Sequence, residues 1–419
     1  MSTVRKRTWK TKTGLQTGWQ VNYVDQQGNR QRKLFKSKKE ADSFETTVRH
    51  EVQQGTHVAE SSTVTVAEAG DLWLGRVKAR GAERATLLQY TQHLDLHIKP
   101  LIGGTKLTKL GAPAVANFED RLREKGVSPS MVNKVMVSLS SIVSHAQRHG
   151  LCSQNAVKLR ERTSSGRDKA PLRVGTDIPT PDEIRALIAA LGDVQQGRWR
   201  PLLLTAIFTG MRASELRGLC WADVDLEARC IHVTRRADRF GEFGPPKSKA
   251  GHRTIPLTPI VVNTLREWKL IYPRPLTGEV DEDGKRLREE AKDSHLVFPN
   301  GSGNVENLGN ILKRGFMPAQ VKAGVSLPKL DSDGKPVLDK KGKPVITAKY
   351  TGFHSLRHFY ASWLINRPEQ GGLGLNPKIV QDRLGHSSVT MTMDVYGHLF
   401  PRGDDAEELA NAERALLGA

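Results

Sequence analysis

The sequence has few of the residues that would indicate a secreted or a metal-binding protein. It contains three cysteines in 419 residues, and Cys152, Cys220 and Cys230 are not closely spaced and form no C-x-x-C or Cys/His pattern. A disulfide framework and a zinc site are therefore not expected, and such cysteines are typical of small core residues in cytosolic proteins. No apolar stretch reaches the ~18 residues of a transmembrane helix, and the basic N-terminus lacks the apolar run of a signal peptide. We expect a cytoplasmic protein without membrane contact, metal or cofactor, and one associated with the nucleoid if its charge reflects a nucleic-acid partner.

Acidic residues are also scarce relative to basic ones. The chain has 64 Lys and Arg against 45 Asp and Glu, which gives a formal net charge of +19. A surplus of this size favours a polyanionic partner, through counterion release and electrostatic steering. Charge alone does not separate nucleic acid from a ribosomal or membrane-surface partner, although it favours nucleic acid.

The first 60 residues combine many basic side chains with a pattern that predicts a small sheet. Residues 1–39 hold eleven Lys and Arg but a single acid. Trp19, Val21 and Tyr23 alternate with polar neighbours, which predicts a strand with one buried face, and a second strand follows a glycine turn. A capping box at 37–40 then opens a short helix. Such a basic run can be a solvated face as easily as a DNA-binding one. The candidate DNA contacts in it are Arg5, Lys6, Arg7, Arg30, Arg32, Lys33 and Lys36.

Two further domains follow, joined by a linker. Residues 63–162 are predicted to form a compact helical domain, because apolar residues recur at helical spacing. Their clearest stripe is Val132, Val135, Met136, Leu139, Ile142, Val143 and Ala146. Residues 163–178 are polar, basic and interrupted by glycine and proline, as in an interdomain linker. A last domain, 179–419, then opens at the capping box Thr180-Pro181-Asp182-Glu183.

The first catalytic candidate in the last domain is an arginine beside a glycine turn. Residues 209–216 read T-G-M-R-A-S-E-L and follow a buried apolar run. Gly210 can end that helix in the left-handed conformation, which would hold Arg212 rigidly at the turn. Glu215 could orient Arg212 from behind. Taken alone, such an arginine is more often a surface ion pair.

A second motif places a histidine and an arginine on one helix face. Residues 354–358 read H-S-L-R-H. His354 and Arg357 are three residues apart and project from the same side of a helix. Two cationic donors aimed at one point suit a phosphate with developing negative charge. The alternative is a solvent-facing helix turn.

A third motif, L-G-H-S-S-V-T-M-T-M-D-V-Y-G-H at 384–398, predicts a helix end, a loop and a new helix. His386 lies in the loop, and Ser387 or Ser388 can cap the helix that follows. The apolar stripe of that helix is Val389, Met393 and Tyr396. Alone, a tyrosine on such a stripe is more often a core aromatic.

Two hairpins are predicted between these motifs. Residues 246–257 form the first, with basic residues at its tip and a return strand from Arg253 to Leu257; its Lys249 and Arg253 are further candidate DNA contacts. The second covers residues 330–348, a weak repeat of D-S-D-G-K-P-V-L and D-K-K-G-K-P-V-I with two turns between apolar ends. This second hairpin is expected at the surface, and no chemistry is visible in it.

The ordered series Arg, Lys, H-x-x-R, L-G-H and Tyr over residues 209–398 resembles the catalytic set of the tyrosine recombinase family, which includes phage and genomic-island integrases. The resemblance implies an α+β protein. Residues 1–60 would be a basic sheet domain that binds arm-type DNA sites, residues 63–162 an all-α domain that binds core sites, and residues 179–419 a mostly helical catalytic domain with a small sheet. The catalytic residues that it implies are Arg212, Lys247, His354, Arg357, His386 and Tyr396. Lys249 could replace Lys247, because the loop length varies in this family.

These residues suit transfer of a phosphodiester to a tyrosine. Arg212 and Arg357 can neutralise the non-bridging oxygens, and more so in the transition state. A tyrosine has a pKa near ~10 and needs help to attack at neutral pH; His354 is expected to assist its proton transfer and His386 to bind the phosphate. Lys247 can protonate the leaving 5′ oxygen. The family resemblance also implies double-stranded DNA attachment sites, a homotetramer on DNA, and a host DNA-bending protein and an excision factor as further partners.

Two alternatives use the same scaffold. A type IB topoisomerase has similar chemistry on one strand, but the flanking domains and the L-G-H-S-S loop favour recombination. A catalytically silent DNA-binding regulator would not need an intact catalytic set.

Overall fold

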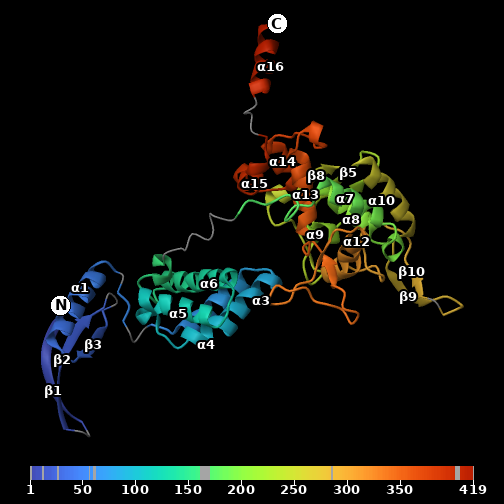
Figure 1. The fold of residues 1–419 in the computed structure, drawn as a ribbon. Coiled ribbons are helices and arrows are strands. Elements are labelled where there is room, and N and C mark those ends of the chain that lie inside the picture. The colour runs from blue at the N-terminus through green and yellow to red at the C-terminus, as the bar shows by residue number, and fades with distance from the viewer. Residues whose placement is uncertain are drawn as a thin grey trace. The chain divides into compact units, whose positions relative to one another are not determined.

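The computed structural model describes residues 2–11, 14–25, 28–55, 57–59, 63–160, 170–284, 286–401 and 406–418 (Figure 1). The chain divides into two compact units, residues 1–168 and 169–419, which are considered separately below. Of the linker expected at 163–178, residues 163–169 lie outside the described residues. The remainder, 170–178, belongs to the second unit.

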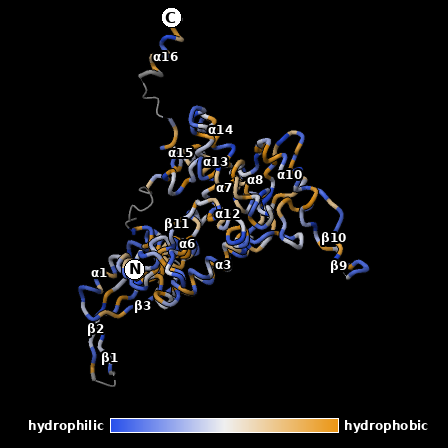
Figure 2. Tube along the Cα trace, turned by 45° about the vertical axis from the view of Figure 1, so that its right-hand side comes forward, coloured by the Kyte–Doolittle hydropathy of each residue, from blue (hydrophilic) through white to orange (hydrophobic). Residues whose placement is uncertain are grey.

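The N-terminal part of the first unit is an antiparallel sheet with one helix. The strands β1 (Thr3–Thr11), β2 (Gly14–Val24) and β3 (Arg30–Phe35) lie in the order β1-β2-β3. The helix α1 (Lys38–Gln53) begins after Ser37, whose hydroxyl accepts the backbone N–H of Glu40 at 3.2 Å. A small core is formed by Val21, Tyr23, Ala41 and Val48. The strand β1 was not predicted, because its sequence T-V-R-K-R-T-W-K-T is almost entirely polar, and Figure 2 shows hydrophilic residues along β1 and β2.

The rest of the first unit is helical. Its α-helices are α2 (Val66–Ala79), α3 (Arg84–Gln92), α4 (Lys99–Ile102), α5 (Ala112–Glu124) and α6 (Pro129–Arg148), with a π-helical turn η1 (His93–Ile98) between α3 and α4. Short 3-10 turns lie at η2 (Leu107–Lys109) and η3 (Ala156–Leu159). The predicted stripe of α6 is buried along its whole length and packs against α2 and α5. This core is separate from that of the N-terminal sheet.

The second unit is mostly helical around one central helix. Its longer helices are α7 (Pro181–Ala190), α8 (Arg200–Thr209), α10 (Pro259–Ile271), α13 (His354–Ile365), α14 (Pro377–Leu384), α15 (Val389–Tyr396) and α16 (Ala406–Leu417). Shorter ones are α9 (Ala213–Arg217), α11 (Leu308–Asn310), α12 (Met317–Lys322) and the π-helical η7 (Ile311–Phe316). Since α8 is apolar on every side, it packs against both α10 and α13 at the centre of the core.

Small sheets complete the second unit. The strands β4 (Val224–Asp225), β5 (Cys230–Val233) and β8 (Arg253–Pro256) form one antiparallel sheet in the order β4-β5-β8. The chain segment that connects β5 to β8 contains a separate pair of strands, β6 (Arg236–Ala237) and β7 (Phe243–Gly244). Two hairpins extend from the unit, β9 (Leu276–Val280) with β10 (Arg286–Arg288), and β11 (Ser326–Pro328) with β12 (Ile346–Ala348). The second of these contains the predicted surface hairpin at 330–348. The expected α+β fold is confirmed.

Candidate active site

Arg212 is held at a sharp turn between two helices. The helix α8 ends at Gly210, which has a φ of +58°, and a Cβ there would overlap the ring of Tyr360. The chain therefore turns at a point where only glycine fits without strain. Arg212 then caps α9, and Glu215 accepts hydrogen bonds from its backbone N–H at 2.9 Å and from its Nη1 at 2.8 Å. The predicted support of Arg212 by Glu215 is thus present.

Glu215 also binds a second arginine, Arg253. Its carboxylate is 2% exposed and accepts a hydrogen bond from Arg253 Nη2 at 2.9 Å. Burial by itself would raise the pKa of Glu215, but Arg253 and Arg212 hold it below its usual value. The Arg253 side chain is only 5% exposed, and its Nε donates to the carbonyl of Arg383 at 2.9 Å. Arg253 was predicted as a DNA contact. In the structure its side chain is buried and bonds to α9 and α14, because it lies on the inward face of β8.

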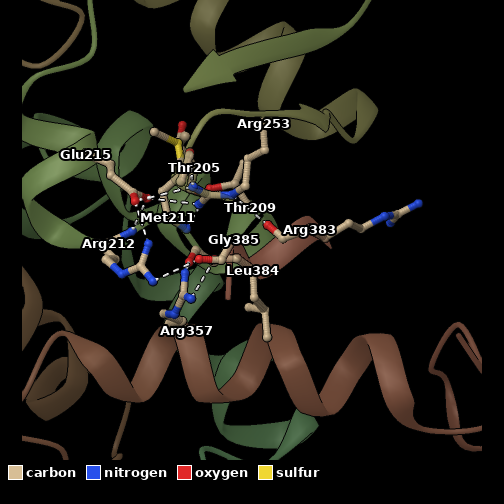
Figure 3. A network of polar contacts seen from close by, with 12 residues as sticks. Thr205, Thr209, Met211, Arg212, Glu215, Arg253, Arg357, Arg383, Leu384 and Gly385 are labelled. Atoms are coloured by element: carbon tan, nitrogen blue, oxygen red, sulfur yellow. Dashed lines mark hydrogen bonds and ion pairs between the residues drawn. The ribbon is translucent and has the colours of Figure 1, made fainter. Parts of the chain in front are cut away.

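Arg357 joins three segments of the chain. Its Nη1 donates to the carbonyl of Gly210 at 2.7 Å and its Nη2 to that of Leu384 at 2.6 Å, while Arg212 Nη2 donates to the carbonyl of Gly385 at 3.2 Å (Figure 3). Burial, and then the charges of Arg212 and Arg253, lower the pKa of Arg357 to about 9, which leaves it charged at neutral pH. Three guanidinium groups and one carboxylate leave two positive charges in excess. This excess suits an anionic ligand.

Two predicted histidines lie beside the arginines and are neutral. Burial, followed by repulsion from Arg357 and Arg212, lowers the pKa of His386 to about 3; its Nδ1 lies 3.0 Å from the hydroxyl of Thr392. His354 begins α13 and keeps part of its surface in solvent. Surrounding protein, and then neighbouring positive groups, lower the pKa of His354 to about 4. Neutral imidazoles at these positions can accept or donate a hydrogen bond to a phosphate.

Tyr396 is buried, and its hydroxyl has a partner that the sequence analysis missed. The residue is 1% exposed at the end of α15, and its ring stacks on that of His386 at 6.2 Å between centroids. Burial raises the pKa of Tyr396 to about 12, although Arg357 and Arg212 oppose the rise. Its hydroxyl lies 2.8 Å from Nδ1 of His358, not beside His354, to which proton transfer was assigned. His358 stands in the predicted pentapeptide H-S-L-R-H, one helical turn after His354, and this spacing was the available signal.

The helix α15, which ends at Tyr396, differs from its predicted pattern. Gly385 ends α14 with a φ of +67°, where a helix end was expected. Of the two expected capping residues, Ser388 caps α15. The predicted stripe is not a buried face, however, because Val389 is 37% and Met393 41% exposed. Only Tyr396 of that stripe is buried.

The candidate lysines are exposed, unlike the residues of the buried cluster. Lys247 and Lys249 are both exposed in the connection before β8, and neither has an ion pair within the described part of the chain. The predicted hairpin is longer than expected, because β8 pairs with β5 and not with the residues just before Lys247. The structure therefore places the two lysines on one loop and does not distinguish between them.

The predicted DNA contacts of the N-terminal sheet are on the first unit. Arg5, Lys6 and Arg7 are exposed on β1. Arg30 and Arg32 lie on the more exposed face of β3, whereas the ammonium of Lys33 lies 4.8 Å from the ring centroid of Phe44. Lys36 is exposed after β3.

The structure adds two negative findings. None of the helices among the described residues is long and apolar enough to span a bilayer. The same residues contain no group of three or more histidine, cysteine or acidic side chains placed to hold a metal ion.

Comparison with known proteins identifies relatives along most of the chain. Residues 179–402 match the model of the phage integrase family. The chain is 25% identical over 391 residues to a tyrosine recombinase XerC-like protein of Caldanaerobacter subterraneus subsp. tengcongensis, covering 90% of each. It is 24% identical to the ICEBs1 integrase of Bacillus subtilis, covering 93% of each.

The fold is similar to those of integrases in complex with DNA. The Tn1549 transposon integrase, solved with a circular intermediate DNA, superimposes with a TM-score of 0.59 at 22% identity, covering 84% of this chain and all of that one. A lambda integrase tetramer bound to a Holliday junction gives 0.51 at 17% identity, covering 91% and 96%.

Proposed function

The chain belongs to the phage integrase family, the tyrosine-type site-specific DNA recombinases, and we propose that Tyr396 is its nucleophile. In this reaction a tyrosine cleaves and rejoins DNA strands of a mobile element through a 3′-phosphotyrosine intermediate. One observation carries the assignment: Arg212, Arg357 and His386 come from separate segments, and all three lie around Tyr396 and the end of α14.

The two arginines bind the scissile phosphate. Arg212 and Arg357 present guanidinium groups to its non-bridging oxygens, which gain charge as the pentavalent transition state forms. Glu215 and Arg253 keep Arg212 in place, since Glu215 binds both guanidinium groups. His354 and His386, both neutral, add hydrogen bonds to the phosphate.

The bond changes balance without an external energy source. The Tyr396 hydroxyl gives its proton to a neighbouring imidazole as its oxygen forms a bond to phosphorus, and the bond from phosphorus to the 5′ oxygen breaks. Lys247, or Lys249 on the same exposed loop, gives a proton to the leaving oxygen. Since the phosphotyrosine conserves the phosphodiester, a 5′-hydroxyl from another strand can reverse the step and join a new partner.

The other parts of the chain supply DNA affinity. Residues 1–60 bind arm-type sites through the basic sheet, residues 63–162 bind the core site, and residues 179–419 carry out catalysis. Recombination between two duplexes calls for four active sites, so we propose a homotetramer on DNA, with a host DNA-bending protein and an excision factor as accessory partners.

The test is covalent capture of a cleaved strand. A nicked duplex carrying the attachment core loses its short 5′-hydroxyl fragment after cleavage, which traps the adduct. We expect wild-type protein to form a covalent complex in EDTA, and Tyr396→Phe to bind the same duplex without an adduct. If both proteins shifted a site known to recombine and neither formed an adduct, the chain would be a DNA-binding protein and not a recombinase.

A further inference from the structure

His358 is the only partner that the described residues give to the Tyr396 hydroxyl. The 2.8 Å contact joins Oη of Tyr396 to Nδ1 of His358. The other two histidines are placed differently: His386 stacks on the tyrosine ring and bonds to Thr392, and the His354 ring meets that of His358 edge-on at 4.8 Å. The nucleophilic oxygen therefore faces one imidazole nitrogen.

The surroundings of His358 favour a neutral ring that can accept a proton. The charged and titratable groups that act on it are Arg357 on its own helix and Asp177 in the segment before α7, with His354 and Tyr396 in ring contact. Burial, and then Arg357, lower the pKa of His358, while Asp177 opposes this. With Nδ1 as the acceptor, the ring carries its hydrogen on Nε2.

We propose that His358 positions the Tyr396 hydroxyl and takes up its proton during attack on the phosphodiester. The proposal rests on the proposed role of Tyr396 as nucleophile. As the bond from Oη to phosphorus forms, the Oη proton moves to Nδ1, and the negative charge of Asp177 favours the resulting imidazolium. In the reverse step Nδ1 returns the proton to the departing tyrosine.

Three variants separate holding the hydroxyl from accepting its proton. In His358→Asn the amide oxygen can replace Nδ1 as a hydrogen-bond acceptor but cannot take a proton. His358→Leu removes both properties. Asp177→Asn removes the negative charge that favours the imidazolium, and its amide oxygen can still accept the N–H of Arg173, as the carboxylate does at 2.9 Å.

The measurement is the rate of adduct formation in a single turnover, from pH 4.5 to 8.5, on the nicked duplex. The wild-type rate should fall on acidification with a limb below the ordinary histidine pKa of about 6.5. We expect His358→Asn to lose this limb and about 10²-fold or more in rate. Asp177→Asn should shift the limb to lower pH.

A sulfur leaving group provides the matched control. A 5′-bridging phosphorothiolate needs no proton donor at the leaving atom, so it should restore the rate of Lys247→Ala but not that of His358→Asn. The proposal would be overturned if His358→Asn and His358→Leu lowered the rate by the same factor at every pH and both kept the acid limb. His358 would then be a packing residue. If wild-type protein formed no adduct at all, the proposed function itself would fail.

A second, independent observation concerns residues 329–349, which form a compact basic element. The repeat places Asp331 and Asp339 at equivalent turns, where each carboxylate accepts two backbone N–H groups at 2.8–2.9 Å. Three backbone hydrogen bonds of 2.7–2.8 Å join Lys329, Val337 and Val345 in a closed ring. The backbone of this element is thus held together by its own hydrogen bonds.

This element has unpaired positive charge. Residues 329–349 contain six lysines and three aspartates, and two of the aspartates bind their own backbone. Four lysines are exposed without an ion pair among the described residues: Lys335, Lys340, Lys341 and Lys343. The other extended hairpin, residues 276–292, has a negative net charge, because it contains six acids and four bases.

We further propose that residues 329–349 bind the phosphate backbone of DNA beside the cleavage site. The strand β12 ends at Ala348, six residues before His354, so its end lies within ~20 Å of the phosphate-binding site. Duplex DNA carries one charge per ~1.7 Å of its axis, so a duplex bound at that site presents a continuous row of phosphates to a basic element beside it.

The test compares two fourfold variants at Lys335, Lys340, Lys341 and Lys343. Lys→Gln should weaken binding of the core duplex, and it should lower the slope of log K against log salt by up to ~0.9 for each lost contact. Lys→Arg keeps the charge and should behave as wild type. An unchanged slope and hydroxyl-radical footprint in the Lys→Gln protein would overturn the proposal, while adduct formation by wild type would still support the recombinase assignment.

Discussion

At the scale of single residues, the buried carboxylate of Glu215 fixes two arginines that come from distant parts of the chain. Arg212 is partly exposed and can reach a ligand, whereas Arg253 is enclosed. The charge of Glu215 thus orients the first arginine while the second neutralises it from the interior.

We therefore expect Arg253→Ala to act on stability as well as activity. The substitution removes one of the two guanidinium groups that balance the buried carboxylate of Glu215 and leaves only Arg212. Loss of a partner from a buried ion pair costs up to about 3–5 kcal/mol. Thermal melting should show a lower transition temperature for the catalytic unit, and adduct formation should fall because Glu215 is no longer held. Lys249→Ala, on the exposed loop, is the control and should melt as wild type. Normal melting of Arg253→Ala with weaker DNA binding would restore Arg253 as a surface DNA contact.

The neutral histidines give the site a pH-dependent stability. Because the pKa of His386 is lowered to about 3 in the folded protein, the unfolded chain binds more protons than the folded one between about pH 6.5 and 3. Stability is thus fully present above pH 6.5 and falls as the pH drops, by about 1.4 kcal/mol per pH unit for one such group. His386→Gln should reduce the loss of melting temperature between pH 6 and 4. Parallel curves for both proteins would show that His386 is not buried in its neutral form.

The sequence indicated which residues come together in the candidate site better than it indicated their individual contacts. The ordered motifs pointed to Arg212, Arg357 and Tyr396, which the structure brings together. The burial of Arg253 depends on the register of β8 against β5, and such long-range pairing is not visible in a local pattern. The hydrogen bond between His358 and Tyr396 likewise joins two different helices, and their contact is not visible in the local sequence of either one.

At the scale of elements, the turn between α8 and α9 connects the core to the site. Gly210 has a positive φ, and its carbonyl accepts a hydrogen bond from Arg357. The same turn also directs Arg212. A change in the backbone here moves both arginines.

Gly210→Ala should therefore impair folding and cleavage together. A side chain in this conformation costs about 1–3 kcal/mol, and the added Cβ would also displace the ring of Tyr360. We expect a lower melting temperature and a reduced single-turnover rate. Gly192→Ala is the matched control, since a Cβ at Gly192 meets no atom within 4 Å. If Gly210→Ala matched this control in both measurements, the turn would not constrain the arginines.

Among the elements, those with strong periodicity were predicted and those without it were missed. The apolar stripe of α6 and the capping boxes before α1 and α7 predicted these helices. The strand β1 was not predicted, because its sequence is polar and shows little alternation. The helix α15 shows the opposite case. Its apolar residues Val389 and Met393 are at helical spacing but remain partly exposed, so periodicity gave the helix and not its buried face.

At the scale of the whole molecule, positive charge is spread over parts with separate cores. The N-terminal sheet has its own small core, and the helical part of the first unit has another. Eleven of the 64 Lys and Arg lie in residues 1–39 with a single acid. This distribution supports separate DNA contacts by the N-terminal sheet, beyond those of the catalytic unit.

Removal of residues 1–60 tests this division of DNA contacts. Because the helical core and the active site use none of these residues, the truncated protein should bind an isolated core site and form the covalent adduct at nearly the wild-type rate. It should recombine long attachment sites poorly, since those carry the proposed arm sequences.

The matched full-length control replaces Arg5, Lys6, Arg7, Arg30, Arg32 and Lys36 with Gln and keeps the small core. If the defect follows the lost charge, both proteins should fail on long sites and succeed on the core. Normal recombination of long sites by the truncated protein would instead place all essential DNA contacts in residues 63–419.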